Sequence, residues 1–543
     1  MMNTAFLTNR KIHIVLFFIS VIISFAYWGN KKEGLFIDEL YSYGLSNSYY
    51  APYLDDLKDF SDGWAIYERN DIRDYLEVRE NDEKFSFSSV YYNQTQDNSP
   101  PLFYMFLNAA SSLFPNSHSK WIGLSLNLFI FLLLIWGLYS LCLRLFNNSD
   151  LSLFTCAMYV FSSIGMSTAL LIRMYALLTL STICLVILVL DLVSGKSSFR
   201  IYGGLALIVC MGMLTHYYFV LYTFFLSIAY LFWSIIRKQN IKGIALFIGS
   251  VIAGLVVMLI IFPSLINHLI SDKVFSGTNA VSNFFDTGRW LSQAKGYSKE
   301  ILHGSFVVLS FTLLHFFSVI LLRKYIIFDK RKFVEVIILV LPAVFTLITV
   351  IIISPVIGTR YILNIFPILM LILPFLISLL LTVPKIAIGK FFMFIIVLLN
   401  MILPFSLTAF APPHLYRGAE AIRCDISKNY AHSPCLYISK GVHQCMTADL
   451  LELLEFDNVF VSKTGFNENA YKYVSSSDSD YLILYVGTSD EWYEATDSKQ
   501  VLDEILATGL YENPQMRSSS IGWLRESYLL KRRSLKVTQD CSD

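Results

Sequence analysis

Two adjacent carboxylates, Asp38 and Glu39, stand shortly after the first long apolar stretch of the chain. Ionised groups are costly in hydrocarbon, so acids kept at the edge of a membrane span are usually paired or chemically employed. A carboxylate at the lip of a cavity can stay ionised at neutral pH and accept a proton from a reacting hydroxyl, as a general base must. The alternative is that the two acids only mark the point where a helix leaves the membrane.

Two arginines stand further along the chain, each close to a tyrosine. Arg173 precedes Tyr175 between two apolar segments, and Arg360 precedes Tyr361 at the start of another. A planar guanidinium is a preferred partner for phosphate, so both arginines are predicted to bind a phosphate group. An arginine at a membrane edge can also extend its charge to lipid headgroups, which is the structural alternative for Arg173.

His216 and Tyr217 stand at a turn of the same kind, and they are predicted to line a substrate cavity together with Tyr175 and Tyr361. A lone histidine among tyrosines is often a packing or aromatic-belt residue, and this alternative stays open. The pair Pro100-Pro101 indicates a rigid entry to a helix, which is a structural signal. Two weaker candidates occur in a polar loop, Asp286 and Arg289.

The composition is that of an integral membrane protein. Of 543 residues 55% are hydrophobic and 15% charged, and the mean hydropathy is +0.55; these values are typical of the membrane class. The net charge of +1 and the lack of a basic run interleaved with aromatic residues argue against nucleic-acid binding. The sequence contains neither a phosphate-binding glycine loop followed by lysine nor a metal-ligand cluster, so neither cofactor nor metal is predicted.

The elements that must position these residues are membrane spans of about 20 residues each. Apolar runs of that size predict about eleven helices, at 12–29, 121–143, 151–170, 174–194, 201–216, 218–236, 243–266, 303–322, 334–354, 361–383 and 388–410. The first run has no small-residue cleavage site after it, so it is predicted to be an uncleaved span. The run Leu102–Phe114, between Pro101 and Pro115, is too short to cross and is expected to lie along the interface.

The distribution of lysine and arginine sets the predicted orientation. Alternate loops carry the bases, at Arg10-Lys11, Arg144, Lys196 with Arg200, Arg237-Lys238 with Lys242, Arg323-Lys324 with Lys330-Arg331-Lys332, and Lys385 with Lys390. The positive-inside rule places these loops and the N-terminus in the cytoplasm. The other loops, which include the acidic loop 31–100, the two arginines, His216 and the C-terminal tail, are then outside the cell. An external enzyme has no access to cytosolic nucleotide sugars, so its activated donor must be in the membrane.

The chain is predicted to divide into a transmembrane core, residues 1–411, and a small extracytoplasmic α/β domain, residues 412–543. After Pro412-Pro413 the composition turns polar, and β-rich runs alternate with helix-like stretches. The predicted strands are Leu436–Ser439, Val459–Ser462, Tyr481–Gly487 and Trp523–Leu530. Four cysteines in this tail are able to form two disulfides, with three possible connectivities: Cys424, Cys435, Cys445 and Cys541.

These residues together resemble the C-type glycosyltransferases of the dolichyl-phosphate-mannose protein mannosyltransferase superfamily, especially the bacterial branch that includes the lipid A aminoarabinose transferase. The resemblance covers about residues 12–410. It rests on Asp38-Glu39, Pro100-Pro101-Leu102-Phe103-Tyr104, Arg173-Met174-Tyr175-Ala176, Thr215-His216-Tyr217, and Arg360-Tyr361 with Pro367. Relatives often have histidine before the proline pair, whereas this chain has Ser99, so no role is carried over to that position.

The resemblance implies transfer of a hexosyl or pentosyl group from a polyprenyl phosphate to a glycan, lipid or protein acceptor in the cell envelope, with inversion. Asp38 is then the base that deprotonates the acceptor and Glu39 supports it, while Arg173 or Arg360 holds the donor phosphate. The implied location is a bacterial plasma membrane. One alternative is a transporter or flippase of a lipid-linked glycan, although such proteins often show repeat symmetry and this chain does not. Another is an inactive envelope-assembly protein whose tail is the working part.

Overall fold

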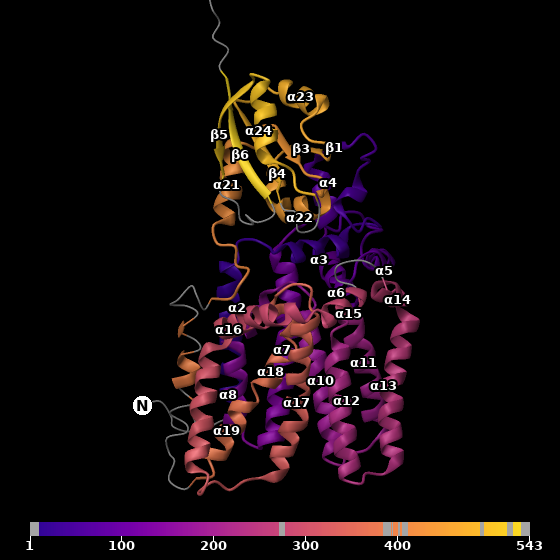
Figure 1. Ribbon diagram of the computed structural model, residues 1–543, viewed down its shortest axis with the longest axis vertical. Helices are drawn as coiled ribbons and strands as arrows, with labels where there is room; N and C mark the ends of the chain where they lie inside the picture. Colours follow the sequence, from indigo (N-terminus) through magenta and orange to yellow (C-terminus); the bar gives the residue numbers. More distant parts are fainter. Residues whose placement is uncertain are drawn as a thin grey trace, which may run out of the picture. The chain divides into compact units, whose positions relative to one another are not determined.

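The computed structural model describes residues 10–270, 277–383, 393, 395–399, 402–403, 411–488, 494–517 and 525–533 (Figure 1). The chain forms two compact units, and each is assembled from separate stretches of sequence. Unit 1 contains residues 1–30, 97–106 and 123–413, and unit 2 contains residues 31–96, 107–122 and 414–543. Each unit is described by itself below. The linear division at residues 411 and 412 stays a prediction.

Unit 1 is built from apolar helices. Their bounds are α2 Arg10–Lys31, α6 Leu102–Ser112, α7 Lys120–Phe146, α8 Ser149–Val160, α9 Ser163–Leu170, α10 Tyr175–Val193, α11 Phe199–Thr215, α12 Phe219–Ile236, α13 Ile241–Ile261, α14 Leu265–Ile270, α15 Gly277–Phe285, α16 Thr287–Leu322, α17 Lys330–Ile353, η2 Thr359–Ile362, α18 Phe366–Leu369 and α19 Ile372–Leu380. Three of these helices extend into unit 2, with residues 107–112 of α6, residues 120–122 of α7 and Lys31 of α2.

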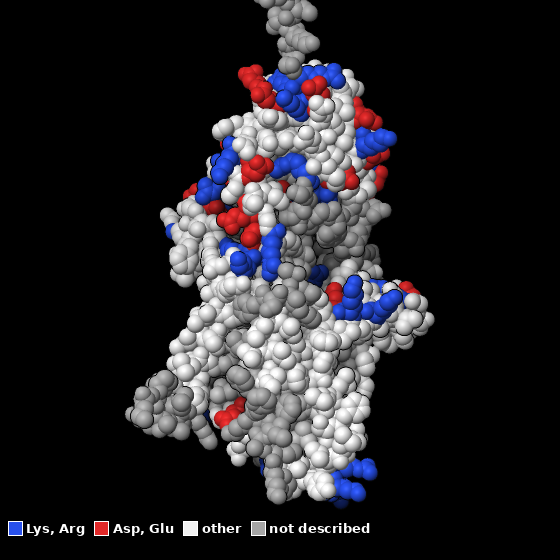
Figure 2. All heavy atoms as spheres, turned by 90° about the vertical axis from the view of Figure 1, so that its left-hand side faces the viewer, with Lys and Arg blue, Asp and Glu red and all other residues white. Residues whose placement is uncertain are grey.

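Seven of the described helices are long and apolar enough to cross a membrane: α2, α7, α10, α12, α13, α16 and α17. Large apolar side chains on them face outward, for example Ile248, Ile252 and Val256 of α13. On the face shown in Figure 2, charged side chains are sparse over the helical bundle and frequent on the sheet-bearing unit. A surface of this kind needs lipid around it. The predicted class, a polytopic α-helical membrane protein with a small C-terminal α/β region, is confirmed.

Three predicted spans differ from single long helices. Residues 151–170 form the pair α8 and α9, which bends by 68°. The bend depends on Gly165, where a Cβ would lie 1.8 Å from the carbonyl oxygen of Tyr159. Residues 361–383 form the short pieces η2, α18 and α19, with Pro367 and Pro374 interrupting the run. The fifth predicted span is the 17-residue α11, and the eleventh, 388–410, lies mostly outside the described residues.

The helix α6, which was expected to lie along the interface, is 11 residues long, in agreement with a run too short to cross. The loop predicted over residues 267–302 is instead largely helical in its described part. It contains the end of α14, all of α15 and the beginning of α16, which kinks at Ser305.

Unit 2 contains one six-stranded mixed sheet with helices around it. The strands are β1 Trp64–Glu68, β2 Cys435–Ile438, β3 Asn458–Ser462, β4 Tyr481–Gly487, β5 Tyr511–Met516 and β6 Arg525–Arg532, in the order β1-β3-β2-β4-β6-β5. β2 pairs in parallel with β3 and β4, and the outer strands are antiparallel. The helices are α3 Ile37–Asn47, η1 Leu54–Leu57, α4 Arg69–Leu76, α5 Phe87–Gln96, α21 Ala419–Asn429, α22 Val442–Leu453, α23 Glu468–Ser475 and α24 Ser498–Ala507.

The four predicted strands coincide with β2, β3, β4 and β6 to within a few residues. The edge strand β1 was not predicted, because it comes from the acidic stretch at residues 31–100, far from the other strands in sequence, and pairs with β3. The two disulfides that the sequence allowed are not formed in the described residues. Cys424 is exposed on α21 and Cys435 is buried in β2, and both are free thiols, whereas two disulfides would pair all four tail cysteines. Cys541 lies outside the described residues.

Candidate functional site

The first candidate group lies in unit 1 and is called here the arginine cluster; it consists of Arg173, Arg360 and His216 with the tyrosines around them. Arg173 stands in the short connection between α9 and α10. Asn127 of α7 holds this connection, since its side-chain amide donates to the backbone oxygens of Leu171, at 2.6 Å, and Ala169, at 3.2 Å. The position of Arg173 is therefore fixed by a buried side chain of the neighbouring helix α7.

The guanidinium of Arg173 contacts a tyrosine from α6. Its Nη1 donates to the hydroxyl of Tyr104 at 2.8 Å, and its Cζ lies 5.8 Å from the centre of the ring. Tyr104 is fully buried, and it follows the rigid Pro100-Pro101 pair by three residues. The proline pair therefore begins α6 and also positions Tyr104 against Arg173.

His216 begins the turn between α11 and α12. Its Nδ1 accepts a hydrogen bond from the backbone N–H of Tyr218 at 3.0 Å, so the neutral ring carries its proton on Nε2. The ring lies 5.7 Å from that of Tyr175 and 5.1 Å from that of Tyr218. The neighbouring Tyr217 shares a 2.7 Å hydrogen bond with Nδ1 of His268.

Arg360 stands on η2, which follows α17. The turn before η2 is held by α16, where a carboxylate oxygen of Glu300 accepts the backbone N–H of Thr359 at 2.7 Å. Nη2 of Arg360 donates to the hydroxyl of Tyr361 at 3.2 Å, and the guanidinium lies 5.1 Å from the centre of that ring. Tyr361 in turn packs against Tyr218, with ring centres 5.5 Å apart. This chain of contacts joins Arg360 to the turn of His216.

The electrostatics of His216 show that both arginines act at one place. Burial of the imidazole, together with the positive charges of Arg173 and Arg360, lowers the pKa of His216 to about 3. The histidine is therefore neutral at physiological pH, and the cluster presents two guanidinium groups and tyrosine hydroxyls. A buried positive field of this kind favours an anion, and two planar guanidiniums suit a phosphate.

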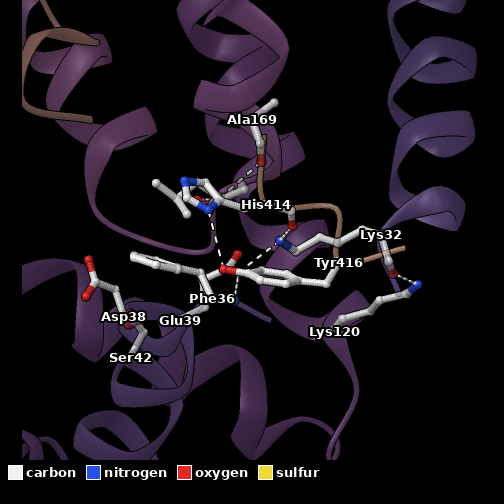
Figure 3. Close-up of polar contacts among 11 residues, drawn as sticks. Lys32, Phe36, Asp38, Glu39, Ser42, Lys120, Ala169, His414 and Tyr416 are labelled. Atoms are coloured by element: carbon white, nitrogen blue, oxygen red, sulfur yellow. Dashed lines mark hydrogen bonds and ion pairs between the residues drawn. The ribbon is translucent and has the colours of Figure 1, made fainter. Parts of the chain in front are cut away.

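The second candidate group is the acidic pair, which lies in unit 2 at the start of α3. Glu39 is fully buried, and one of its oxygens accepts from Lys32 Nζ at 2.8 Å and from the backbone N–H of Phe36 at 2.6 Å. Lys32 is 1% exposed and also donates to the backbone oxygen of His414 at 2.9 Å. Figure 3 shows the lysine and the Phe36 backbone converging on the Glu39 carboxylate.

Asp38 differs from its neighbour. It lies in the first turn of α3, is half-buried, and its carboxylate points away from that of Glu39 (Figure 3). Its backbone oxygen accepts from the hydroxyl of Ser42 at 2.9 Å. The two acids therefore have different environments: Glu39 anchors the start of the helix through a buried ion pair, and Asp38 presents its carboxylate elsewhere.

The structure brings together six of the predicted site residues, and all of them belong to unit 1: Arg173, Tyr175, His216, Tyr217, Arg360 and Tyr361. Asp38 and Glu39 belong to unit 2. The weaker candidate Arg289 has a structural contact, because its Nη2 donates to the backbone oxygens of Ser354 and Pro355. Within the described residues no group of three His, Cys, Asp or Glu side chains is arranged to hold a metal ion.

Sequence reasoning missed several residues that support these groups. Lys32 gave no sequence signal, because a lysine at the end of an apolar run is usually a solvated flank. Tyr104 and Tyr218 stood within motifs that were noted for other reasons, and their contacts to Arg173 and Tyr361 depend on segments distant in sequence. A buried asparagine inside the apolar run of α7, Asn127, was a usable signal, since such a residue needs hydrogen-bond partners.

Residues 98–266 match the family model described as dolichyl-phosphate-mannose-protein mannosyltransferase. The predicted resemblance to this glycosyltransferase superfamily is confirmed. The matched residues include Tyr104, Arg173, Tyr175, His216 and Tyr217, which is most of the arginine cluster. Asp38, Glu39 and Arg360 lie outside the matched residues. No curated protein sequence matches the chain.

Two solved structures are similar to the chain over most of its length. One is ArnT from Cupriavidus metallidurans bound to undecaprenyl phosphate, with a TM-score of 0.47 and 11% identity, covering 95% of this chain and 97% of that chain. The other is the same protein in the apo state, with a TM-score of 0.47 and 12% identity, covering 96% and 98%.

Proposed function

We propose that this protein transfers a sugar from a polyprenyl-phosphate donor to a cell-envelope acceptor at the outer face of a bacterial plasma membrane. The observation that carries the proposal is the arginine cluster, most of which lies within the residues that match the family model. In it the positive charges of Arg173 and Arg360 act on a neutral, buried histidine at the turn between α11 and α12. The matched family is named for dolichyl-phosphate-mannose, a sugar linked to a polyisoprenoid phosphate.

The arginines carry the leaving-group side of the reaction. In the proposed reaction the bond between the anomeric carbon and the phosphate oxygen breaks, and the departing phosphate keeps the electron pair. Arg173 and Arg360 stabilise the negative charge that develops on it, as preorganised donors do in a low-dielectric site. A phosphate is already a competent leaving group, so no general acid is required. His216 stays neutral at working pH, and its Nε2 proton is available as a hydrogen-bond donor to the phosphate or the sugar.

Asp38 carries the acceptor side. Its carboxylate takes the proton of the acceptor hydroxyl as the hydroxyl oxygen forms its bond to the anomeric carbon. A single displacement of this kind inverts the anomeric centre and needs no covalent enzyme intermediate, in contrast to retaining glycosidases. Glu39 supports the base by fixing the first turn of α3 through its bonds to Lys32 and Phe36.

The outward orientation rests on the loop charges. The connection between α10 and α11 carries Lys196 and the one between α12 and α13 carries Lys238. Lys242 lies in the first turn of α13, and Arg144 in the last turn of α7. By chain direction these positions lie at the helix ends opposite the α11–α12 turn of His216. The positive-inside rule puts the basic ends in the cytoplasm and the arginine cluster outside. The N-terminus is then cytoplasmic and the C-terminal region extracytoplasmic.

The experiment uses the full chain in right-side-out membrane vesicles that contain the native acceptors. A panel of radiolabelled polyprenyl-phosphate hexoses and pentoses is added from outside, and label in lipid, glycan and protein fractions is measured. Asp38→Asn should abolish transfer, because the amide cannot accept the proton, while Asp82→Asn, an exposed acid of the same external segment, should leave it unchanged. Equal transfer by Asp38→Asn and the unmodified protein would remove Asp38 as the base. Absence of transfer with every donor would contradict the proposed function.

A further inference from the structure

A cavity of about 790 Å³ lies in unit 1 between α11 and α13, at the end of these helices remote from His216. Both helices begin at the cavity and run away from it in the same direction. α11 contains 17 residues, which is about 25 Å at the helical rise per residue, before the turn of His216. The cavity is therefore separate from the arginine cluster, and no step of the proposed reaction uses it.

The cavity exists because the two helices touch closely at one point and separate toward their N-terminal ends. A Cβ at Gly254 would lie 2.5 Å from the backbone oxygen of Ala206, so the backbones are in close contact there. Nearer the N-terminal ends, a Cβ at Gly203 or Gly249 would meet nothing within 4 Å. Gly254 thus allows the two helices to pack closely, whereas the space beside Gly203 and Gly249 stays open.

The lining of the cavity is polar at its rim and apolar along its wall. Lys196, Lys242 and Ser197 are at the rim, and Leu192, Ala206 and Ala253 are among the wall residues. The lining residues of α13 extend from Lys242 to Ala253, which is about 16 Å along the helix axis. α13 itself is a lipid-facing helix with exposed Ile248 and Ile252. A polar rim that continues into an apolar wall beside lipid matches a ligand with a polar headgroup and an apolar chain.

The charge at the rim is positive. Lys196 pairs with Asp191 of α10, whose Oδ1 lies 2.8 Å from Lys196 Nζ and 2.6 Å from Arg144 Nη1, so this acid is shared by two bases. Lys242 has no acidic partner in the described part of the chain. The further charged side chains on the elements that enclose the cavity are basic: Arg200, Arg237 and Lys238. An anionic headgroup is the complement of such a rim.

We propose that this cavity binds an anionic phospholipid of the surrounding membrane. The lipid phosphate lies between Lys196 and Lys242, and the upper part of an acyl chain lies along the apolar wall toward Gly249 and Ala253. On the orientation argued above this is a lipid of the cytoplasmic leaflet. The site itself does not depend on the proposed sugar transfer, because it is defined by charge, volume and lipid exposure alone.

The test measures lipid binding to the purified full chain by native mass spectrometry in detergent. Phosphatidylglycerol and phosphatidylcholine of equal chain length are titrated separately. Phosphatidylglycerol should bind at least five-fold more tightly, since a basic residue near an anionic headgroup contributes about 1 kcal/mol. Lys242→Ala should reduce this preference about five-fold. Gly249→Leu should also reduce it by filling the open space, and thermal unfolding in lipid-free detergent checks that this variant is folded.

Lys332→Ala is the matched control, because Lys332 stands in the first turn of α17, another helix whose basic start is assigned to the same side. It should keep the full preference. Equal binding of the two lipids, or the same loss in the control as in Lys242→Ala, would overturn the proposal. Displacement of phosphatidylglycerol by an equal concentration of glycerol 3-phosphate would assign the site to a soluble phosphate instead. Stronger binding of undecaprenyl phosphate than of phosphatidylglycerol would likewise overturn the assignment to a phospholipid.

Discussion

At the level of single residues, the neutral histidine between two arginines defines the chemistry that unit 1 can perform. An imidazole with a pKa of about 3 is neither a cation nor an effective acid at neutral pH. The arginines therefore supply all of the positive charge, and the tyrosine hydroxyls of Tyr104 and Tyr361 orient them. Fixed donors are suited to holding a phosphate while its bond to the sugar breaks, because they stabilise the negative charge that grows on the phosphate without having to move.

Removal of either guanidinium should weaken donor binding. Arg173→Ala and Arg360→Ala should each raise the KM for the polyprenyl-phosphate sugar by about 10- to 100-fold, since a hydrogen bond to a charged group contributes about 1.5–3 kcal/mol. Tyr104→Phe should have a smaller effect, because it removes only the hydroxyl that orients Arg173. Initial rates in vesicles at varied donor concentration give these values. Arg237→Ala, at the opposite end of α12, is the control, and donor affinity that survives both alanine changes would place the phosphate site elsewhere.

Some site residues could be predicted from the sequence, and others could not. Arg173 and Arg360 could be predicted because charges are rare and costly where apolar runs end, so each stands out in the printed sequence. Lys32 could not, because its importance arises from burial beside Glu39 and from the backbone of His414, which is 382 residues away in sequence. No local pattern reports such a contact.

At the level of secondary-structure elements, the start of α3 depends on one buried ion pair. Lys32→Met should destabilise the protein by about 3–5 kcal/mol, because it leaves the Glu39 carboxylate buried without its partner. The double variant with Glu39→Gln should recover much of this loss, since the amide oxygen still accepts the Phe36 N–H. Thermal unfolding of the full chain in detergent measures both. Lys31→Met at the exposed neighbouring position should change little, and an equal loss in that variant would assign the effect to the helix end in general.

The segment between α6 and α7 should make unit 2 sensitive to acid. Burial, with the charge of Arg423, lowers the pKa of His118 to about 4, and its ring packs against Tyr43 at 5.0 Å. An unfolded histidine takes up its proton near pH 6.5, so between these values the unfolded chain binds more protons than the folded one. The free energy of unfolding should therefore fall as the pH falls from about 6.5 to 4, by at most about 1.4 kcal/mol per pH unit.

His118→Phe keeps an aromatic ring at this position without a titrating group. Melting temperatures at pH 7.5, 6.0 and 5.0 should fall less steeply in the variant than in the unmodified protein. The same slope in both proteins would show that other groups account for the acid sensitivity.

Element prediction was most reliable where one physical constraint dominates. Long apolar runs gave the helices of unit 1, and β-rich runs between polar stretches gave β2, β3, β4 and β6. It was less accurate where two constraints compete. Pro367 and Pro374 break a run that is apolar enough to span, and the helices of residues 277–302 form in a stretch whose polarity resembles a loop.

At the level of the whole molecule, the proposed reaction requires the acidic pair of unit 2 and the arginine cluster of unit 1 to act on one substrate. Spin labels at the exposed positions Tyr49, which follows α3, and Val220, on α12, provide a direct measurement by double electron–electron resonance. With donor lipid present, the distance distribution should be narrow and centred below about 30 Å, since a prenyl-phosphate sugar has to contact both groups. A broad distribution centred well beyond that length would contradict a shared site.

The pairing of β1 with β3 has a consequence for biogenesis. Residue 68 pairs with residue 458, so about 390 residues are synthesised between the two partners of this sheet edge. At typical translation rates of about 5–20 residues per second, the segment that contains β1 waits roughly 20–80 seconds for the strand that pairs with it. During that interval its backbone groups are an open template for wrong partners. Completion of this sheet edge therefore depends on the residues from 458 onward, and a nascent chain that stalls before residue 458 leaves β1 without its partner.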